Sequence, residues 1–162
     1  MKKLKAFTLI ELLIVIAIIA IIAAVVFVAL NPLQRFQDSR DSRRAADSEA
    51  ILSAIKLDQV DNGGSYLSAI SAMTAGDVYM IGTDSSACNT YTCDTPVTGA
   101  ASCVNLTGLV TNGKVGSVPI SPKGATTWTA GHTGYTLSRA STGIVTVRSC
   151  ESENTTEISA SK

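Results

Sequence analysis

Nineteen consecutive apolar residues, 12–30, follow a basic start that contains Lys2, Lys3 and Lys5. As a helix, this run is about 28 Å long, close to the roughly 30 Å hydrocarbon layer of a bilayer. The sequence therefore predicts a membrane-spanning helix, with the lysines on the cytoplasmic side and the rest of the chain outside. A cleaved secretory signal fits less well, because the run exceeds an apolar core of about 7 to 15 residues and no Ala-x-Ala lies near its end.

Glu11 places a carboxylate at the entrance of this apolar helix. An ionised side chain in the middle of a bilayer costs about 2.5 to 3.5 kcal/mol on insertion scales, and less near the end of the span. A helix that served only as an anchor gains nothing from this charge. Glu11 is therefore predicted to meet a cationic partner, and a glutamate that only reaches toward the membrane interface is the alternative.

The segment around Glu11 reads Ala-Phe-Thr-Leu-Ile-Glu at residues 6–11 and resembles the class III signal of type IV pilins and pseudopilins. The resemblance implies that a membrane-embedded prepilin peptidase cuts between Ala6 and Phe7, and that the new amine of Phe7 is methylated. It also implies that Glu11 pairs with the N-terminal amine of a neighbouring subunit. The two opposite charges would offset each other's desolvation in an apolar helix bundle.

Two positions depart from the usual pattern of that family. Ala6 stands where the family usually has glycine, and Pro32 lies just beyond the apolar run rather than inside it. Proline lacks an amide hydrogen and clashes with the preceding helical turn. We therefore expect any kink or local melting of the helix at its exit from the membrane.

The composition of the chain changes near Asn62, because all twelve glycines and all four cysteines follow it. After a leader of residues 1–6, residues 7–62 read as one long helix that ends at Asn62-Gly63-Gly64. Residues 63–162 read as an extracellular head rich in Ser, Thr and Gly. We predict an α+β fold, in which the long helix packs on a small antiparallel sheet.

The second half of the long helix carries a charged segment and then an apolar stripe. Residues 37–44 contain no apolar side chain, so we expect a solvated or subunit-facing collar. Its arginines and acids can pair three or four residues apart or between neighbouring subunits. Ile51, Leu52 and Ile55 share one helix face and are predicted to bury against the head.

The head contains four short strand candidates. They are residues 78–81, 104–110, 135–139 and 144–150, and the last two lie at hairpin spacing. A proline loop at 118–122 precedes this hairpin. The C-terminal residues 151–162 are expected to be loose.

Cys88, Cys93, Cys103 and Cys150 are predicted to form two disulfides on the outer side of the membrane, with three pairings open. We favour Cys88–Cys93 with Cys103–Cys150, because the second bond ties down the final strand and adds about 4 kcal/mol on the loop-entropy model. A zinc site is the rival interpretation, but the spacing lacks paired Cys-x-x-Cys motifs and the chain has one histidine. Neither a metal nor a cofactor is expected.

The single histidine, His132, lies in a glycine-rich loop without an evident nucleophile, so the sequence gives no basis for an enzyme. Charge balances overall, but residues 57–94 hold five acids and no base, whereas residues 95–150 hold four bases and no acid. Three interpretations of this split stay open: plain solvation, lateral packing between heads, and DNA binding by a basic sheet with Trp128 and Tyr135.

We therefore expect a structural subunit of a type IV pilus-like filament. It is stored in the inner or plasma membrane with a cytoplasmic N-terminus and then assembled at the cell surface, in roles such as cell adhesion or twitching motility. Its partners are further copies of itself, prepilin peptidase and the pilus or secretion assembly machinery. Two alternatives stay open: a pseudopilin of a type II secretion or DNA-uptake (competence) system, and a monomeric membrane-anchored extracellular binding module.

Overall fold

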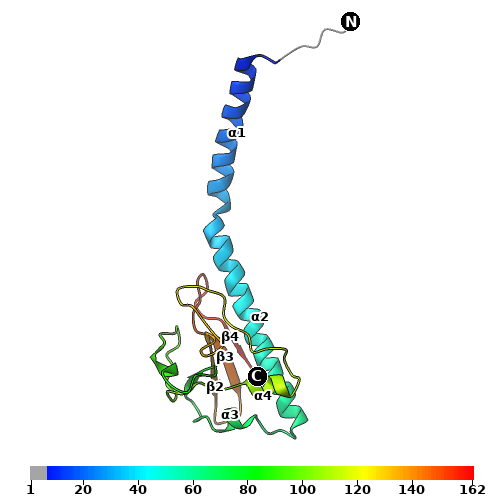
Figure 1. Cartoon of the computed structure of the whole chain (residues 1–162), viewed down its shortest axis with the longest axis vertical. Helices are drawn as coiled ribbons and strands as arrows, with labels where there is room; N and C mark the ends of the chain where they lie inside the picture. Colours follow the sequence, from blue (N-terminus) through cyan, green and yellow to red (C-terminus); the bar gives the residue numbers. More distant parts are fainter. Residues whose placement is uncertain (1–6) are drawn as a thin grey trace. The chain divides into compact units, whose positions relative to one another are not determined.

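The computed structural model describes residues 7–162 and places them in two compact units, one ending at Phe36 and the other spanning Gln37–Lys162 (Figure 1). Helix α1 spans Leu9–Leu30, and helix α2 spans Pro32–Asp61. Asn31 separates them in a left-handed conformation, with φ 39° and ψ 70°. Because a residue before proline is disfavoured in the α region, this break confirms the kink predicted at the end of the apolar run.

The C-terminal end of α2 also follows the prediction. Gly63 and Gly64 have φ of 64° and 94°, which glycine adopts without a Cβ clash. The amide of Gly64 donates to the carbonyl of Gln59 at 2.8 Å and closes the last helical turn. The glycine pair therefore turns the chain from the helix into the head.

The head contains a four-stranded antiparallel sheet in the order β1-β2-β3-β4. The strands are β1 (Val78–Met80), β2 (Tyr135–Arg139), β3 (Val145–Ser149) and β4 (Ser159–Ser161). Three short helices lie in the connections: α3 (Ser68–Ser71), η1 (Cys88–Thr90) and α4 (Thr107–Thr111). The predicted hairpin is present, since Leu137 of β2 opposes Val147 of β3.

One face of the sheet packs against α2. Ile51, Leu52 and Ile55 are at most 7% exposed and belong to the same hydrophobic core as Leu137 and Val147 (Figure 1). The predicted apolar stripe is therefore confirmed. The long N-terminal helix and the small antiparallel sheet together make the α+β architecture that the sequence predicts.

Ile55→Ala is expected to lower the free energy of unfolding of the head by about 2 to 5 kcal/mol, because it leaves a cavity at a site that is 1% exposed. Urea unfolding followed by the fluorescence of Trp128 measures this loss. Leu57→Ala is the control, because Leu57 is 50% exposed on the same helix and should cost less than about 1 kcal/mol. Equal losses in the two variants would contradict the packing of α2 on the sheet.

Two predictions about the head are wrong. Residues 104–110 do not form a strand: Val104 makes an isolated bridge with Ile81, and α4 follows it. Asn105 accounts for this, because its Oδ1 accepts the amide of Thr107 at 2.9 Å and starts a helical turn. The C-terminal segment is not loose either, since β4 pairs with β3 and Ile158 is 7% exposed.

The favoured disulfide pairing is also wrong. The structure joins Cys88 to Cys103 and Cys93 to Cys150. Backbone hydrogen bonds explain the difference. The amide of Cys88 donates to Ala101 at 2.7 Å, which brings the chain back toward Cys103, and the amide of Asp94 donates to Cys150 at 2.8 Å.

Candidate functional site

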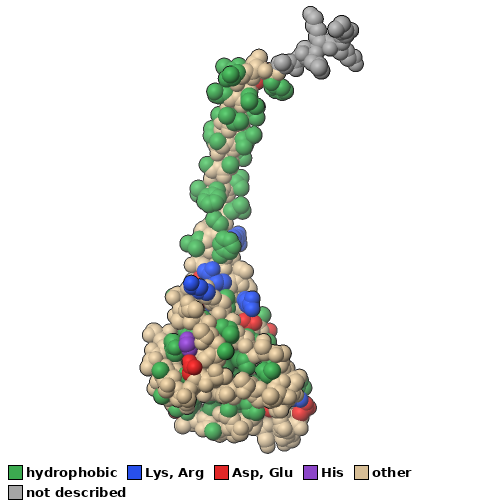
Figure 2. Space-filling view, in the orientation of Figure 1, with side chains coloured by type: hydrophobic (Ala, Val, Ile, Leu, Met, Phe, Trp, Pro, Cys, Tyr) green, Lys and Arg blue, Asp and Glu red, His purple; other side chains and the backbone are tan. Residues whose placement is uncertain are grey.

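Apart from Glu11, the side chains of α1 are apolar, and they are exposed along the whole helix. None of its 22 residues is buried, and its large apolar side chains are between 47% and 82% exposed. Figure 2 shows hydrophobic side chains along the visible face of this helix. Within residues 7–162, the helix that begins at Leu9 is the one helix long and apolar enough to cross a membrane. Such a surface needs lipid or other chains to cover it.

The N-terminal end of α1 is polar. Thr8 is the N-cap, and its hydroxyl oxygen accepts the amide of Glu11 at 3.3 Å. Glu11 in turn accepts the amide and the hydroxyl of Thr8, each at 2.8 Å and each on Oε2. This capping box holds the carboxylate at the helix N-terminus, where the helix dipole favours negative charge.

The structure therefore brings Phe7 and Glu11 to the same helix end. Phe7 is 83% exposed and directly precedes the N-cap residue. Ala6, on the other side of the predicted cleavage site, lies outside the described residues. The arrangement defines a class of protein: a single apolar helix with an acidic N-terminal end, followed by a small α+β head.

Residues 1–27 match the family model for the prokaryotic N-terminal methylation motif, which is the class III signal of type IV pilins and pseudopilins. Searches of curated proteins and of solved structures return no match. The motif, with the apolar helix that begins at Leu9, supports a type IV pilin-like or pseudopilin-like N-terminal segment.

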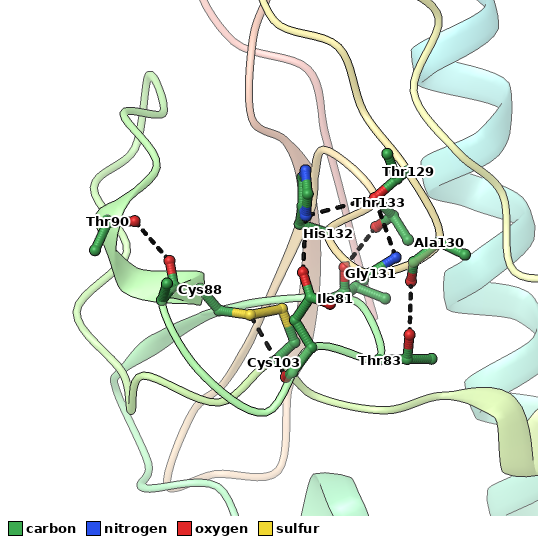
Figure 3. The surroundings of a disulfide bond; sticks show 12 residues. Ile81, Thr83, Cys88, Thr90, Cys103, Thr129, Ala130, Gly131, His132 and Thr133 are labelled. Atoms are coloured by element: carbon green, nitrogen blue, oxygen red, sulfur yellow. Dashed lines mark hydrogen bonds and ion pairs between the residues drawn. A yellow bond between two sulfur atoms is a disulfide. The ribbon is translucent and has the colours of Figure 1, made fainter.

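His132 lies beside the loop closed by the Cys88–Cys103 disulfide (Figure 3). Its Nδ1 lies 2.8 Å from Oδ2 of Asp84, and its ring stacks on Tyr91 with 4.4 Å between ring centroids. These contacts join the disulfide loop to the loop before β2. Among the described residues, no group of three or more His, Cys, Asp or Glu side chains is placed to hold a metal ion.

The aromatic residues of the predicted DNA surface are buried. Trp128 is 7% exposed and Tyr135 is fully buried, so neither ring can stack on a base. Tyr135 instead donates its hydroxyl to Asp47 at 2.8 Å, and burial together with this bond raises the pKa of Tyr135 well above its ordinary value. The DNA-binding interpretation of the head therefore loses the two aromatic side chains, Trp128 and Tyr135, on which it relied.

Most of the basic residues in the acid-free stretch are also engaged within the head. Lys114 pairs with Asp61, and Arg148 donates to Glu157 at 2.8 Å. Arg139 donates to the carbonyl of Met73 at 2.9 Å. These contacts within the head engage three of the basic side chains that were candidates for binding DNA or a neighbouring head.

The charged collar at residues 37–44 is partly buried, so the predicted solvated or subunit-facing face is wrong for two of its members. Asp41 is 5% exposed and Arg44 is fully buried. The five N–H donor positions of Arg44 all have acceptors within 3.2 Å. These acceptors are Asp41, Ser121, Pro122, Glu151 and Glu153.

Sequence reasoning missed Glu151 and Glu153 because they lie in the segment expected to be loose. One signal pointed to them. They are the first acids after the acid-free stretch 95–150, and the arginine-rich collar needs acidic partners. The structure supplies those partners from the C-terminal segment of the same chain, so Arg40 and Arg44 pair within the subunit.

Glu153 predicts a pH dependence of stability. The pKa of Glu153 falls to about 2, from an ordinary 4.5, chiefly because Arg40 donates hydrogen bonds to it; burial opposes this, and the hydrogen bond and charge of Arg44 add to the lowering. A carboxyl group with a lowered folded-state pKa stabilises the protein fully above its unfolded pKa and loses this effect as pH falls toward the folded pKa. The free energy of unfolding should therefore fall as pH is lowered from 4.5 to 2.

Urea unfolding at several pH values through this range measures the effect. Glu153→Gln should be less stable than the native protein at pH 6, and its stability should depend less steeply on pH below 4.5. Glu157→Gln is the matched control, since Glu157 is a half-exposed acid of the same segment. Identical pH profiles for the native protein and Glu153→Gln would refute the assignment.

Proposed function

We propose that the chain is the precursor of a structural subunit of a type IV pilus-like filament. In this proposal residues 1–6 are a leader, residues 7–62 are the polymerising helix with 12–30 in the membrane, and residues 63–162 are the extracellular head. One observation carries it: a helix with no buried residue begins inside a prepilin-type methylation motif. Copies of the same helix are the partners that such a filament provides.

The sequence of events follows from the chemistry of the helix. Prepilin peptidase cuts between Ala6 and Phe7 on the cytoplasmic side, and the apolar residues of α1 hold the subunit in lipid. Transfer from lipid to a helix bundle changes little for these residues, because both surroundings are apolar. The direction of transfer therefore has to come from polar groups, and Glu11 is the acidic group that the structure places at the helix end.

Glu11 is proposed to meet the methylated amine of Phe7 on a neighbouring subunit. Its two hydrogen bonds from Thr8 end on one oxygen, Oε2. The capping box fixes the carboxylate at the end of the helix, ready for an ammonium group. An opposite charge offsets the desolvation that an ionised carboxylate otherwise pays in an apolar bundle.

The mass of the N-terminal peptide of the protein from its native cells tests the proposal. We expect a chain that begins at Phe7 and carries one added methyl group. A mature, surface-exposed protein that still begins at Met1 would refute processing as a pilin-class subunit and leave a tethered extracellular module.

A pseudopilin of a type II secretion or DNA-uptake system is the second candidate, because the matched motif is common to pilins and pseudopilins. Its short fibre works as a piston rather than as a surface organelle. Abundant long fibres in a sheared surface fraction favour the pilin, and their absence favours the pseudopilin.

A further inference from the structure

Residues 33–36, just after the break between α1 and α2, are exposed. Asn31 takes a left-handed conformation that ends α1, and Pro32 has no amide hydrogen to donate. The first buried residue of α2 is Asp41. A short helical segment that buries no side chain is marginally stable in water, so unwinding that starts at Asn31 meets its first buried side chain at Asp41.

The C-terminal segment forms hydrogen bonds with α2 shortly after residues 33–36. We name residues 151–154 the tail strap. The carboxylate of Asp41 accepts the amide of Asn154 at 2.8 Å and that of Glu153 at 3.1 Å. Arg40 donates to Glu153 at 2.7 Å, and Asn154 donates its side-chain amide to Asp38 at 2.8 Å.

Arg44, about one helical turn after Asp41, makes further contacts with the tail strap. Its Nη1 donates to Glu153 at 2.8 Å and its Nη2 donates to Glu151 at 3.1 Å, while the guanidinium is fully buried. Gly124 closes over the pair: a Cβ there would lie 2.8 Å from Nη2 of Arg44 and 2.5 Å from Oε1 of Glu151. Because the planar guanidinium uses all five of its donors, lysine cannot reproduce this arrangement.

The strap is itself fastened to the head. It directly follows Cys150, which is bonded to Cys93. Trp128 donates its indole N–H to Glu151 at 2.9 Å, and Ser152 donates its hydroxyl to Asp94 at 2.7 Å. A continuous path of ionic contacts and one covalent cross-link therefore leads from α2 into the body of the head.

We propose that the tail strap anchors α2 to the head at residues 38–44, so that unwinding of the helix from the Asn31 break stops there. The helix before residue 38 can bend or unwind while residues 38–44 stay bound to the head. The role of this anchor in a filament, where tension reaches the head through the helix, rests on the proposed function. The anchoring itself does not, and it can be measured on the unassembled protein.

Hydrogen–deuterium exchange of the full chain in detergent micelles tests the anchor. In the native protein, amides of residues 33–37 should exchange faster than those of residues 42–48. Glu153→Gln and Arg44→Met should each speed exchange at residues 42–48 by about tenfold or more, since each removes charge-assisted hydrogen bonds. The sheet amides of β2 should keep their native rates.

Arg43→Met is the matched control. Arg43 neighbours Arg44 on the same helix, but its side chain is 69% exposed and its pair with Asp47 is long, at 3.7 Å. It should change exchange at residues 42–48 by less than about twofold. If Arg44→Met does not fold, Glu153→Gln carries the test, because it keeps the size of the side chain.

Two results would overturn the anchor. Native exchange rates at residues 42–48 in Glu153→Gln would show that the strap does not hold the helix. Equal acceleration of β2, β3 and the helix would show that the cluster supports the whole head rather than the attachment of α2. Neither result bears on cleavage or methylation at Phe7, so the anchor and the filament proposal can fail separately.

Discussion

Glu11→Leu is expected to abolish filament formation while leaving the subunit in the membrane. Leucine joins Leu9 and Ile10 to the apolar run and extends it by three residues, so insertion of α1 into lipid should not suffer. The variant leaves the amine of Phe7 on the neighbouring subunit without its carboxylate. Removing one partner of a buried ion pair costs roughly 3 to 5 kcal/mol, which corresponds to a loss of subunit affinity of about a hundredfold or more.

The measurement compares filaments in the sheared fraction with subunit in the membrane fraction, by immunoblot of the same cells. Glu11→Asp is one control, because it keeps the charge and should retain part of the assembly. Leu12→Ile is the other, because it changes an adjacent apolar residue without adding or removing charge. If Glu11→Leu assembles as well as Leu12→Ile, the proposed ion pair is wrong and a simple membrane anchor explains the helix better.

The helical half of the protein could be predicted because its signals are local. The apolar run, the break near Pro32 and the end at Asn62-Gly63-Gly64 each depend on residues within a turn or two of one another. The same holds for Ile51, Leu52 and Ile55, whose spacing alone places them on one face. The methylation motif is also a short contiguous segment, so its match at residues 1–27 follows from the sequence directly.

The head was harder to predict because its decisive contacts join residues that are far apart in the sequence. Arg44 is read as a surface charge in a polar helix segment, yet Glu153 reaches it from more than one hundred residues away. The return of acidic residues after the acid-free stretch 95–150 is the one signal near residue 153, and it does not tell which arginine they meet. Charged and backbone groups fix the strap, and the pairing of β4 with β3 together with the burial of Ile158 fixes the rest of the C-terminal segment.

The disulfides show the same limit. Loop entropy favours any bond that closes a long loop, and both Cys103–Cys150 and Cys93–Cys150 do so. The choice between them depends on which backbone segments lie together. The amide of Asp94 bonds to Cys150 and the amide of Cys88 bonds to Ala101, and no spacing rule contains that information.

Replacing Cys93 and Cys150 together by serine is expected to destabilise the head more than replacing Cys88 and Cys103. The Cys93–Cys150 bond spans 57 residues and the Cys88–Cys103 bond spans 15. The loop-entropy model assigns about 4 kcal/mol to the first and about 3 kcal/mol to the second. Urea unfolding of the full chain in detergent, followed by Trp128 fluorescence, gives both values.

The two double variants should also differ in which region of the protein exchanges faster, because Cys150 directly precedes the tail strap. Loss of the Cys93–Cys150 bond should speed hydrogen exchange in residues 151–161 and then in residues 42–48 of α2, where Asp41 and Arg44 lose a fixed partner. Loss of the Cys88–Cys103 bond should speed exchange mainly within residues 84–103. If both double variants open the same region by the same factor, the Cys93–Cys150 bond does not fasten the strap, and the ionic contacts with α2 suffice to hold it.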